Sequence, residues 1–305
     1  MQIKKNKDNK EIKNHGDFQF PVLVSDECLS NYDNRTFAWH WHPEIELTVI
    51  IQGEMVYKVS NKTFHLNEGD MLFVNANALH MGKANDFGDC IYISTTFEPK
   101  LIYGYDNSII QKKYIDGIIF NTNLSSMKIS QSSEAGKDIR LELLRIHDLY
   151  NDKTDLYELE MQVALSNIWI KLMRLFPYDQ MNDFVLKNDY KIISEITCFI
   201  HENYRNKLTL DEIAASVSMS KGQCCKYFKM NTHQTIFEYI LEYRIKQSML
   251  LLKSTDYSIT EIACLVGFSD PGYYSKIFYR YVDCTPSNYK KAFTSMDKFL
   301  PVINS

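Results

Sequence analysis

The first hundred residues show the alternating hydrophobic pattern of short β-strands. From about Asp17 to Phe97, segments rich in Val, Ile, Tyr, Phe and Thr are separated by turn residues such as Gly53 and Gly69. The strand-like segments are FAWHWH, EIELTVIIQ, EMVYKVS, TFHL, DMLFVN and CIYISTTF. Many short strands at this spacing predict a barrel or a sandwich.

The pattern becomes helical after a polar, Ser-rich interval. Residues 139–150 and 156–176 carry apolar side chains at three-to-four spacing, so each segment predicts an amphipathic helix. In the second helix Leu159, Val163, Ile170 and Met173 fall on or near one stripe, and Trp169 and Leu172 widen it. A helix packed on the barrel and a seam between two copies of the chain both account for this stripe.

The last third of the chain contains an internal repeat, in which LTLDEIAASVSMSKGQCCKYFK aligns with YSITEIACLVGFSDPGYYSKIFY. Each copy opens with a capping box, which satisfies the free amides of a helix start. The boxes are Thr209 with Glu212 and Ser258 with Glu261. A short turn follows in each copy, with a serine placed to cap the next helix. The repeat therefore predicts two helix-turn-helix units.

The segment between the two copies, IFEYILEYRIKQSMLLLKS, predicts one continuous helix because it lacks Pro and Gly and is apolar at helical spacing. Such a helix would fix the distance between the two units. Two recognition helices held on one face can enter successive major grooves about 34 Å apart. One polypeptide would then contact two adjacent half-sites on DNA.

The second copy and its tail, EIACLVGFSDPGYYSKIFYRYVDCTPSNYKK, resemble the signature of the AraC/XylS family of transcription regulators. The match covers roughly the last third of the chain. The resemblance implies a cytoplasmic bacterial protein that binds double-stranded promoter DNA. It also favours activation of transcription through RNA polymerase.

By the same resemblance, the first recognition helix begins at Ser220 and the second begins near Asp270. Lys226 and Lys276 occupy the position where the family usually carries a basic residue. A lysine there either bonds guanine O6 and N7 or contacts a phosphate, which positions the protein without specifying sequence. The residues expected to face DNA are Ser220, Lys221, Gly222, Gln223, Cys225, Lys226, Pro271, Gly272, Ser275 and Lys276.

The chain departs from the family pattern in two ways. His233 and Asp283 replace the glycine that usually follows each recognition helix, although both residue types tolerate a left-handed backbone better than most. The first recognition helix is also poor in base-reading side chains, because Gly222 and Cys225 occupy exposed positions. With groove shape contributing, the residues expected to give specificity are Gln223, Lys226, Ser275 and Lys276.

Length and charge agree with this organisation. A chain of 305 residues is long enough for two domains with separate cores. From Lys187 onward 15 Lys and Arg accompany 12 Asp and Glu, whereas the preceding part has 19 and 26. A mildly basic C-terminal part is weak evidence for nucleic acid. The seven cysteines lack C-x-x-C pairs, and no apolar run suggests a signal peptide or a membrane span, so reduced thiols and the cytoplasm are expected.

The stretch HWHPEIELTVIIQG, which starts at His40, adds candidate chemistry to the barrel. On a regular strand, residues of equal parity project to the same face and can line a pocket. The spacing of two histidines, a glutamate and a later histidine resembles the cupin pattern, and sensory domains of AraC-type regulators often carry such a stretch. The residues expected to bind a small-molecule effector are His40, His42, Glu44, Glu46 and His80.

The same residues leave alternatives open. His40, His42, Glu46 and His80 form a ligand set for Fe, Mn, Zn, Ni or Cu, as in a cupin-type metal-dependent enzyme. A metal-sensing or redox-sensing regulator could use the histidines together with Cys90. The simplest interpretation is that the histidines make ordinary hydrogen bonds to nearby carboxylates or backbone. No other catalytic motif is present, so the enzyme hypothesis depends on the cupin residues alone.

Together these patterns predict an α+β chain in which a cupin-like β-barrel precedes an all-α domain. The expected protein is a homodimeric transcription regulator without catalytic activity, cofactor or membrane partner. The predicted parts are an effector-binding barrel at 17–120, a helical dimerisation segment at 137–176, a linker at 177–189 and a double helix-turn-helix domain at 190–294.

Overall fold

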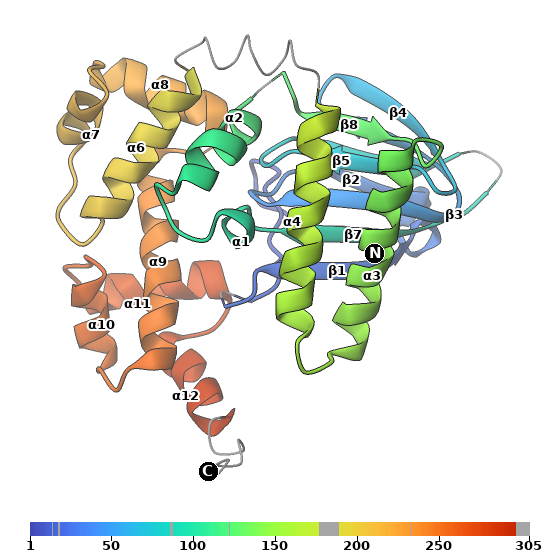
Figure 1. Ribbon diagram of the computed structural model, residues 1–305. Coiled ribbons are helices and arrows are strands. Elements are labelled where there is room, and N and C mark those ends of the chain that lie inside the picture. The colour runs from blue at the N-terminus through green and yellow to red at the C-terminus, as the bar shows by residue number, and fades with distance from the viewer. Residues whose placement is uncertain are drawn as a thin grey trace. The chain divides into compact units, whose positions relative to one another are not determined.

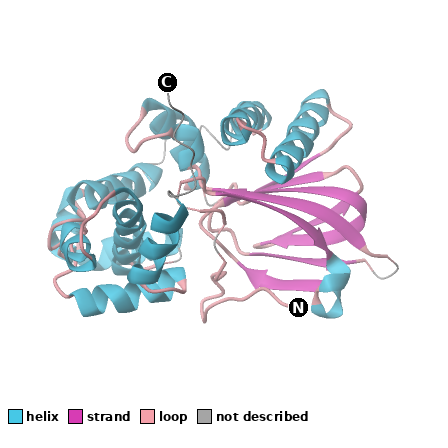
Figure 2. Cartoon of the chain, turned by 90° about the horizontal axis from the view of Figure 1, so that it is seen from below, coloured by secondary structure: helices cyan, strands magenta, loops and turns pink. Residues whose placement is uncertain are grey.

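The computed structural model (Figure 1) describes residues 1–13, 15–17, 19–85, 88–121, 123–176, 189–232 and 234–296. Its contacts divide the chain into two compact units, with the boundary between Lys191 and Ile192. Figure 2 shows an antiparallel sheet with helices in the first unit, and helices and loops in the described part of the second. The predicted α+β class is confirmed. Residues 177–188 of the predicted linker lie outside the described residues.

The first unit contains a sheet of eight strands centred on β3. β3 pairs antiparallel with β4, β5, β6 and β7, while β1 pairs with β7, β8 with β5, and β2 with β6. One long strand therefore joins two groups of strands. Their bounds are β1 Val22–Cys28, β2 Thr36–His40, β3 Ile45–Val59, β4 Lys62–Asn67, β5 Met71–Val74, β6 His80–Ala84, β7 Cys90–Phe97 and β8 Ser126–Ile129.

The sequence predicts a turn at Gly53, but β3 continues through this residue. Gly53 has φ +82°, and a Cβ there would lie 2.0 Å from the carbonyl oxygen of Asp89. The pairing register shifts between Ile50 and Gln52, which is a β-bulge. The bulge and the glycine let the first half of β3 pair with β5 and β7 and its second half with β4 and β6.

Three strands, β1, β6 and β8, are not among the predicted segments. β8 lies in the polar, Ser-rich interval beyond residue 120, where its sequence SMKI carries no strand pattern of its own. It pairs with β5 in full register, from Met71 opposite Ile129 to Val74 opposite Ser126. Tertiary pairing, and not local composition, makes this segment a strand.

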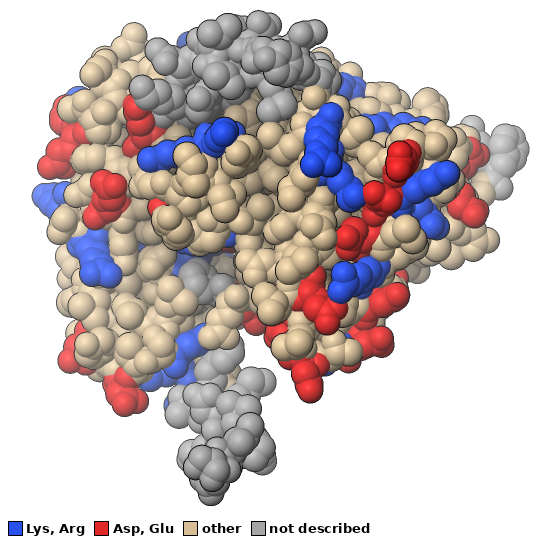
Figure 3. All heavy atoms as spheres, in the orientation of Figure 1, with Lys and Arg blue, Asp and Glu red and all other residues tan. Residues whose placement is uncertain are grey.

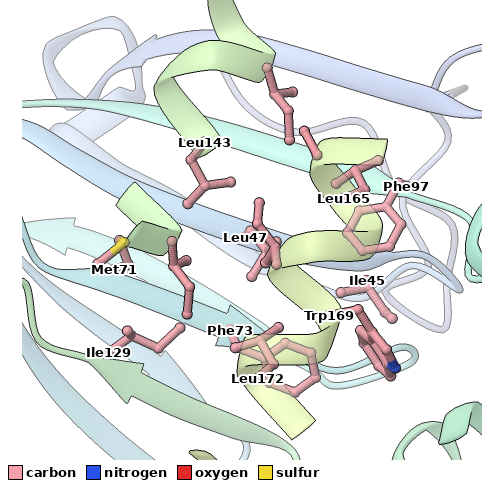
Figure 4. Packing of buried hydrophobic residues seen from close by; sticks show 14 of the residues in the cluster. Ile45, Leu47, Met71, Phe73, Phe97, Ile129, Leu143, Leu165, Trp169 and Leu172 are labelled. Carbon is pink, nitrogen blue, oxygen red and sulfur yellow. The ribbon is translucent and has the colours of Figure 1, made fainter. Parts of the chain in front are cut away.

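Two long helices, α3 and α4, cover one face of the sheet. Figure 4 shows Leu143, Leu165 and Trp169 packed with the sheet residues Leu47 and Phe73 in one buried cluster. The helical elements of this unit are η1 Leu29–Asn31, η2 Asp33–Arg35, α1 Lys100–Tyr103, η3 Gln111–Ile115, α2 Asp116–Ile119, α3 Glu134–Asp152 and α4 Tyr157–Leu175. A second apolar cluster, which includes Ile50, Tyr57, Leu66 and Leu72, lies among the strands.

Acidic side chains lie on the surface of the first unit around the loop between α3 and α4. Asp152, Asp155 and Glu158 are exposed there, and acidic side chains gather around this loop in Figure 3. Among the described residues, no helix combines the length and apolar character needed to cross a bilayer.

The second unit contains the predicted repeat as two helix pairs, α7–α8 and α10–α11. Both pairs pack against α9. Ile262, Val266 and Phe278 form part of the buried cluster around α10 and α11. The helices are α6 Asp189–Asn203, α7 Leu210–Ser216, α8 Lys221–Thr232, α9 Ile236–Ser254, α10 Ile259–Leu265, α11 Pro271–Val282 and α12 Pro286–Met296.

Both predicted capping boxes are present, at the starts of α7 and α10. A third box, Thr235 with Glu238, starts α9. Ser220 precedes α8, and its Oγ accepts a hydrogen bond from the backbone of Gln223. The expected serine cap of α11 is wrong, because the cap is Asp270, whose carboxylate accepts from the backbone N–H of Gly272.

The left-handed residue expected after α11 is confirmed, since Asp283 has φ +58° and forms the C-cap. The corresponding position after α8, His233, lies outside the described residues. The turns inside the two helix pairs, α7–α8 and α10–α11, also match. Ser218 and Gly267 occupy aligned positions, and both have positive φ, +54° and +90°.

The packing of α3 predicts a large cost for truncating its buried face. Ile146→Ala should lower the free energy of unfolding of the first unit by about 2–5 kcal/mol, because Ile146 is fully buried and its removal leaves a cavity. All three tryptophans lie in the first unit, so urea denaturation followed by tryptophan fluorescence reports this unit. Ile109→Ala is the control, because Ile109 is 71% exposed. Equal effects of the two substitutions would contradict the packing.

Candidate functional site

The pairing of β2 with β6 brings the predicted histidines together. His40 at the end of β2 lies opposite His80 at the start of β6, and their ring centroids are 4.1 Å apart. The ring of His42, just after β2, lies 5.0 Å from that of His80. Glu46 projects from β3 into the same group, and all of these side chains are buried. The residues chosen from sequence spacing therefore form one cluster in space.

A cavity of about 380 Å³ opens beside this cluster. Its volume is within the range of small-molecule sites, roughly 300–1,000 Å³. His40 and Glu46 line it, whereas His42, Glu44 and His80 are not among its lining residues. The other lining residues are Met1, Gln2, Ile3, Lys4, Glu11, Ile12, Lys13, His15, Leu23, Ser25, Glu27, Tyr32, Phe37, Tyr57, Tyr92, Ser94 and Thr96.

The N-terminal segment brings two further residues to this cavity that the sequence analysis did not single out, Glu11 and His15. His15 Nδ1 lies 3.0 Å from Glu44 Oε2, and His15 Nε2 lies 3.1 Å from Glu11 Oε2. No hydrophobic period marks this polar segment as part of the domain, so only the fold places it at the cavity. The segment MQIKKNKDNKEIKNHG gives no signal beyond the presence of these two residue types.

His42 lies between two buried carboxylates. Its Nδ1 is 3.5 Å from Glu44 Oε2, and its Nε2 is 3.3 Å from Glu46 Oε2. Burial opposes the charge on His42, but the hydrogen bonds and charges of these carboxylates outweigh burial and raise its pKa to about 10. Burial likewise opposes the charge on Glu44 and Glu46, yet their histidine partners hold both carboxyl pKa values well below the usual range.

His40 and His80 are in a different state. Nδ1–H of His40 donates to the carbonyl oxygen of Ala38 at 2.9 Å, and Nδ1–H of His80 donates to that of Ala78 at 2.8 Å. A carbonyl can only accept, so Nδ1 carries the proton and the Nε2 lone pair is left available. Burial lowers the pKa of His40 to about 2 and that of His80 to about 4, and neighbouring imidazoles add to this shift.

Glu46 is fixed by hydroxyl groups on its other oxygen. Thr48 Oγ1 and Tyr57 Oη each donate to Glu46 Oε1 at 2.7 Å. Its Oε2 therefore faces His42 and His80, at 3.3 and 3.7 Å from their Nε2 atoms. Burial raises the pKa of Tyr57 well above its usual value, and the charge of Glu46 raises it further.

The cluster has the chemistry of a metal site. The potential ligand atoms of His40, His42 and His80 lie within 4.8 Å of one another, and Nε2 of His80 has no hydrogen-bond partner among the described residues. His40 and His80, which are neutral imidazoles oriented by backbone carbonyls, are typical metal ligands, whereas His42 is held protonated by its carboxylates and would release that proton on binding an ion. Cys90 is not part of any such group in the described chain; it is buried in the apolar cluster of the strands, and burial raises its thiol pKa to about 12.

In the second unit, the residues expected to face DNA lie at the surface of α8 and α11. Lys226 and Lys276 are exposed and form no ion pair with any described residue. Lys221, in contrast, pairs with Asp211 at 2.9 Å. The positions are exposed for Ser220, Lys221, Gly222, Gln223, Lys226, Gly272 and Lys276, and partly buried for Cys225, Pro271 and Ser275.

Several of these side chains already have local partners. Ser220 Oγ donates to Gln223 Oε1 at 2.8 Å, and Ser275 Oγ donates to the carbonyl oxygen of Pro271 at 3.0 Å. Tyr273, 47% exposed at the start of α11, was not singled out from the sequence. In a helical pattern an aromatic residue suggests a core position. Only the structure shows that the side chain of Tyr273 is exposed.

Comparisons with known proteins match both units. A model described as "AraC-like ligand binding domain" matches residues 27–167, and one described as "Helix-turn-helix domain" matches residues 213–292. An uncharacterized HTH-type transcriptional regulator of Bacillus subtilis, YdeC, is 29% identical over 92% of this chain and 96% of its own length. The melibiose operon regulatory protein of Escherichia coli is 24% identical, covering 83% of each chain.

A solved structure is similar to part of this chain. It is the C-terminal domain of the two-component response regulator yesN from Fusobacterium nucleatum, which is 32% identical over 31% of this chain and 93% of its own, with a TM-score of 0.30.

The charge balance around His42 predicts the effect of removing one carboxylate. Glu46→Gln should lower the pKa of His42 from about 10, because burial would then be opposed by Glu44 alone. An NMR pH titration of the histidine ring nitrogens in EDTA-treated protein measures this change. Glu54→Gln removes the same charge from an exposed position of β3 and should leave the pKa of His42 unchanged. A His42 that titrates alike in both variants would rule out this charge balance.

Proposed function

The chain belongs to the AraC family of transcription regulators, and we propose that it binds promoter DNA under the control of a small molecule held in the cavity of its first unit. The observation that carries this proposal is the combination, in one polypeptide, of two helix-turn-helix units with a cavity lined by both charged and apolar side chains. The cavity alone would provide no site for DNA, and the helix-turn-helix units alone would provide no site for an effector.

The DNA-binding proposal depends on the equivalence of α8 and α11. Lys226 and Lys276 are exposed on these helices, where each could contact a phosphate or a guanine. The connecting helix α9 has 19 residues, and at 1.5 Å per residue it is about 28 Å long. That length is comparable to the spacing of about 34 Å between successive major grooves. The proposed base-reading residues are Gln223, Lys226, Ser275 and Lys276.

The effector proposal depends on the lining of the cavity. Glu11, Glu27 and Glu46 supply acceptors, while Phe37 and Tyr92 supply apolar ring surface. Such a lining suits a small polar molecule that carries hydrogen-bond donors on one side and an apolar face on the other. Binding can change DNA affinity only if the effector has different affinities for two states of the protein. A reporter gene that responds identically in the wild type and in Glu46→Ala under every growth condition tried would refute this control.

We further propose that the active form is a homodimer in the cytoplasm that activates transcription through RNA polymerase. The exposed stripe of α4 is the proposed interface, because Leu159, Val163 and Ile170 are 59%, 49% and 50% exposed on one helix face. The opposite face of α4 packs on the sheet. Apolar side chains aligned on the free face of a surface helix suit a symmetric helix-to-helix contact.

No catalytic role or cofactor is part of this proposal. The cupin-type enzyme remains the second candidate, because the histidine cluster fits a metal ion. The related proteins are transcription regulators, which favours regulation over catalysis. The two candidates differ in which residues matter, since an enzyme would keep its turnover when the recognition helices are altered.

The proposal predicts that Lys226→Ala combined with Lys276→Ala abolishes tight promoter binding. If both lysines contact phosphates, the slope of log K against log salt should fall by about 2, because each contact releases about 0.9 counterion. Fluorescence anisotropy with promoter DNA at several salt concentrations measures both quantities. Lys83→Ala combined with Lys137→Ala is the control, since it removes the same charge from exposed positions of the first unit. Equal weakening by both double variants would argue for a general charge effect.

The proposed interface predicts that Leu159→Glu combined with Val163→Glu converts the dimer to a monomer, because buried like charges would face each other across the contact. Native mass spectrometry or analytical ultracentrifugation gives the subunit count. Ile109→Glu introduces a charge at another exposed apolar position and should leave the dimer intact. A wild-type protein that is monomeric at micromolar concentration would exclude this interface.

A further inference from the structure

The N-terminal segment is docked on Trp41, the residue that follows β2, and this docking fixes the position of Glu11. The backbone N–H of Glu11 donates to the carbonyl oxygen of Trp41 at 2.9 Å, and that of Trp41 donates to the carbonyl oxygen of Asn9 at 3.0 Å. Lys5 and Glu11 form an antiparallel bridge within the segment. The segment is therefore a small hairpin bridged to the chain directly after His40.

The carboxylate of Glu11 faces the imidazole cluster. Its Oε2 lies 3.8 Å from His40 Nε2. The distances from Glu46 Oε2 to Nε2 of His42 and His80 are 3.3 and 3.7 Å. The 3.3 Å separation is a long hydrogen bond, and the separations of 3.7 and 3.8 Å exceed hydrogen-bonding distance. They are shorter than about 4.2 Å, which is the largest separation of two ligands each about 2.1 Å from one ion.

An unpartnered nitrogen points to a missing ligand at this place. His80 is 1% exposed, and its Nε2 has no hydrogen-bond partner among the described residues. A buried polar atom without a partner is costly, so a native structure normally supplies one. The Nδ1 atoms of His40 and His80 are both held by backbone carbonyls, which orient the Nε2 lone pairs as in metal sites.

We propose that His40, His42, His80 and Glu46 bind one divalent first-row transition-metal ion, and that Glu11 of the N-terminal hairpin is a further ligand of the same ion. Three imidazoles and two carboxylates suit Zn²⁺, Fe²⁺, Mn²⁺ or Co²⁺. His15 is the positioning residue for Glu11, because it bridges Glu11 and Glu44 through its two nitrogens. The inference rests on the proposed sensory role of the first unit and names the regulation of that site.

Glu11 belongs to the hairpin, so its coordination of the ion would couple metal binding to the docking of residues 1–13. An ion that binds more tightly when Glu11 is in place stabilises the docked hairpin by the same free energy. The hairpin also lines the cavity through Gln2, Lys4 and Ile12. Metal occupancy would therefore determine whether the cavity is closed on this side.

The test is a titration of the full-length, EDTA-stripped protein with Co²⁺, without DNA. Visible absorption of Co²⁺ reports its stoichiometry and coordination, and hydrogen exchange mass spectrometry reports protection of residues 1–13. Glu11→Gln removes the proposed ligand. Asp8→Asn is the matched control, because it removes the same charge from an exposed position of the same segment.

We expect one Co²⁺ per chain, and slower exchange of residues 1–13 on Co²⁺ addition, in the wild type and in Asp8→Asn. Glu11→Gln should bind Co²⁺ at least about tenfold more weakly, with an altered spectrum and little protection of the hairpin. The inference is overturned if the wild type binds no Co²⁺, or if Glu11→Gln matches Asp8→Asn in affinity and protection. Promoter binding is measured separately with the lysine variants, so a failure here is distinguishable from a failure of the proposed function.

Discussion

The burial of negative charge beside the cavity is the constraint on which the first unit depends. Glu44 and Glu46 lie inside the domain, where an unpaired carboxylate would cost several kcal/mol. His42 sits between them, and His15 reaches Glu44 from a different part of the chain. The strands β2, β3 and β6 must therefore meet with their polar faces together, and the N-terminal hairpin must close beside them.

The second unit presents two equivalent helices, α8 and α11, from one chain. Both copies of the repeat use the same capping chemistry, so α7 and α10 begin at corresponding residues. α9 carries its own capping box and packs against both pairs. Local hydrogen bonds define where each helix begins, and the apolar faces then decide how the helices pack.

Much of this could be predicted because periodicity and capping are local. The repeat, the helix starts and the histidine cluster followed from residue types at fixed spacing. β8 and the course of β3 through Gly53 could not, since both depend on partners distant in sequence. Glu11 and His15 were missed for the same reason, because nothing in a polar segment indicates which buried group it will contact. Asp270 displaced the expected serine because either side chain can cap a helix.

The aligned turns of the two helix pairs differ at their left-handed residue, which is Ser218 in α7–α8 and Gly267 in α10–α11. Gly267 adopts φ +90° without strain, and a Cβ there would lie 2.6 Å from the carbonyl oxygen of Tyr204, so the second turn requires glycine. Ser218 adopts φ +54° in the first turn, a conformation that costs a non-glycine residue of order 1 kcal/mol. The turn of the first helix pair, α7–α8, thus carries backbone strain that the turn of the second pair, α10–α11, does not. The two helix pairs therefore hold the same left-handed turn conformation at unequal backbone cost.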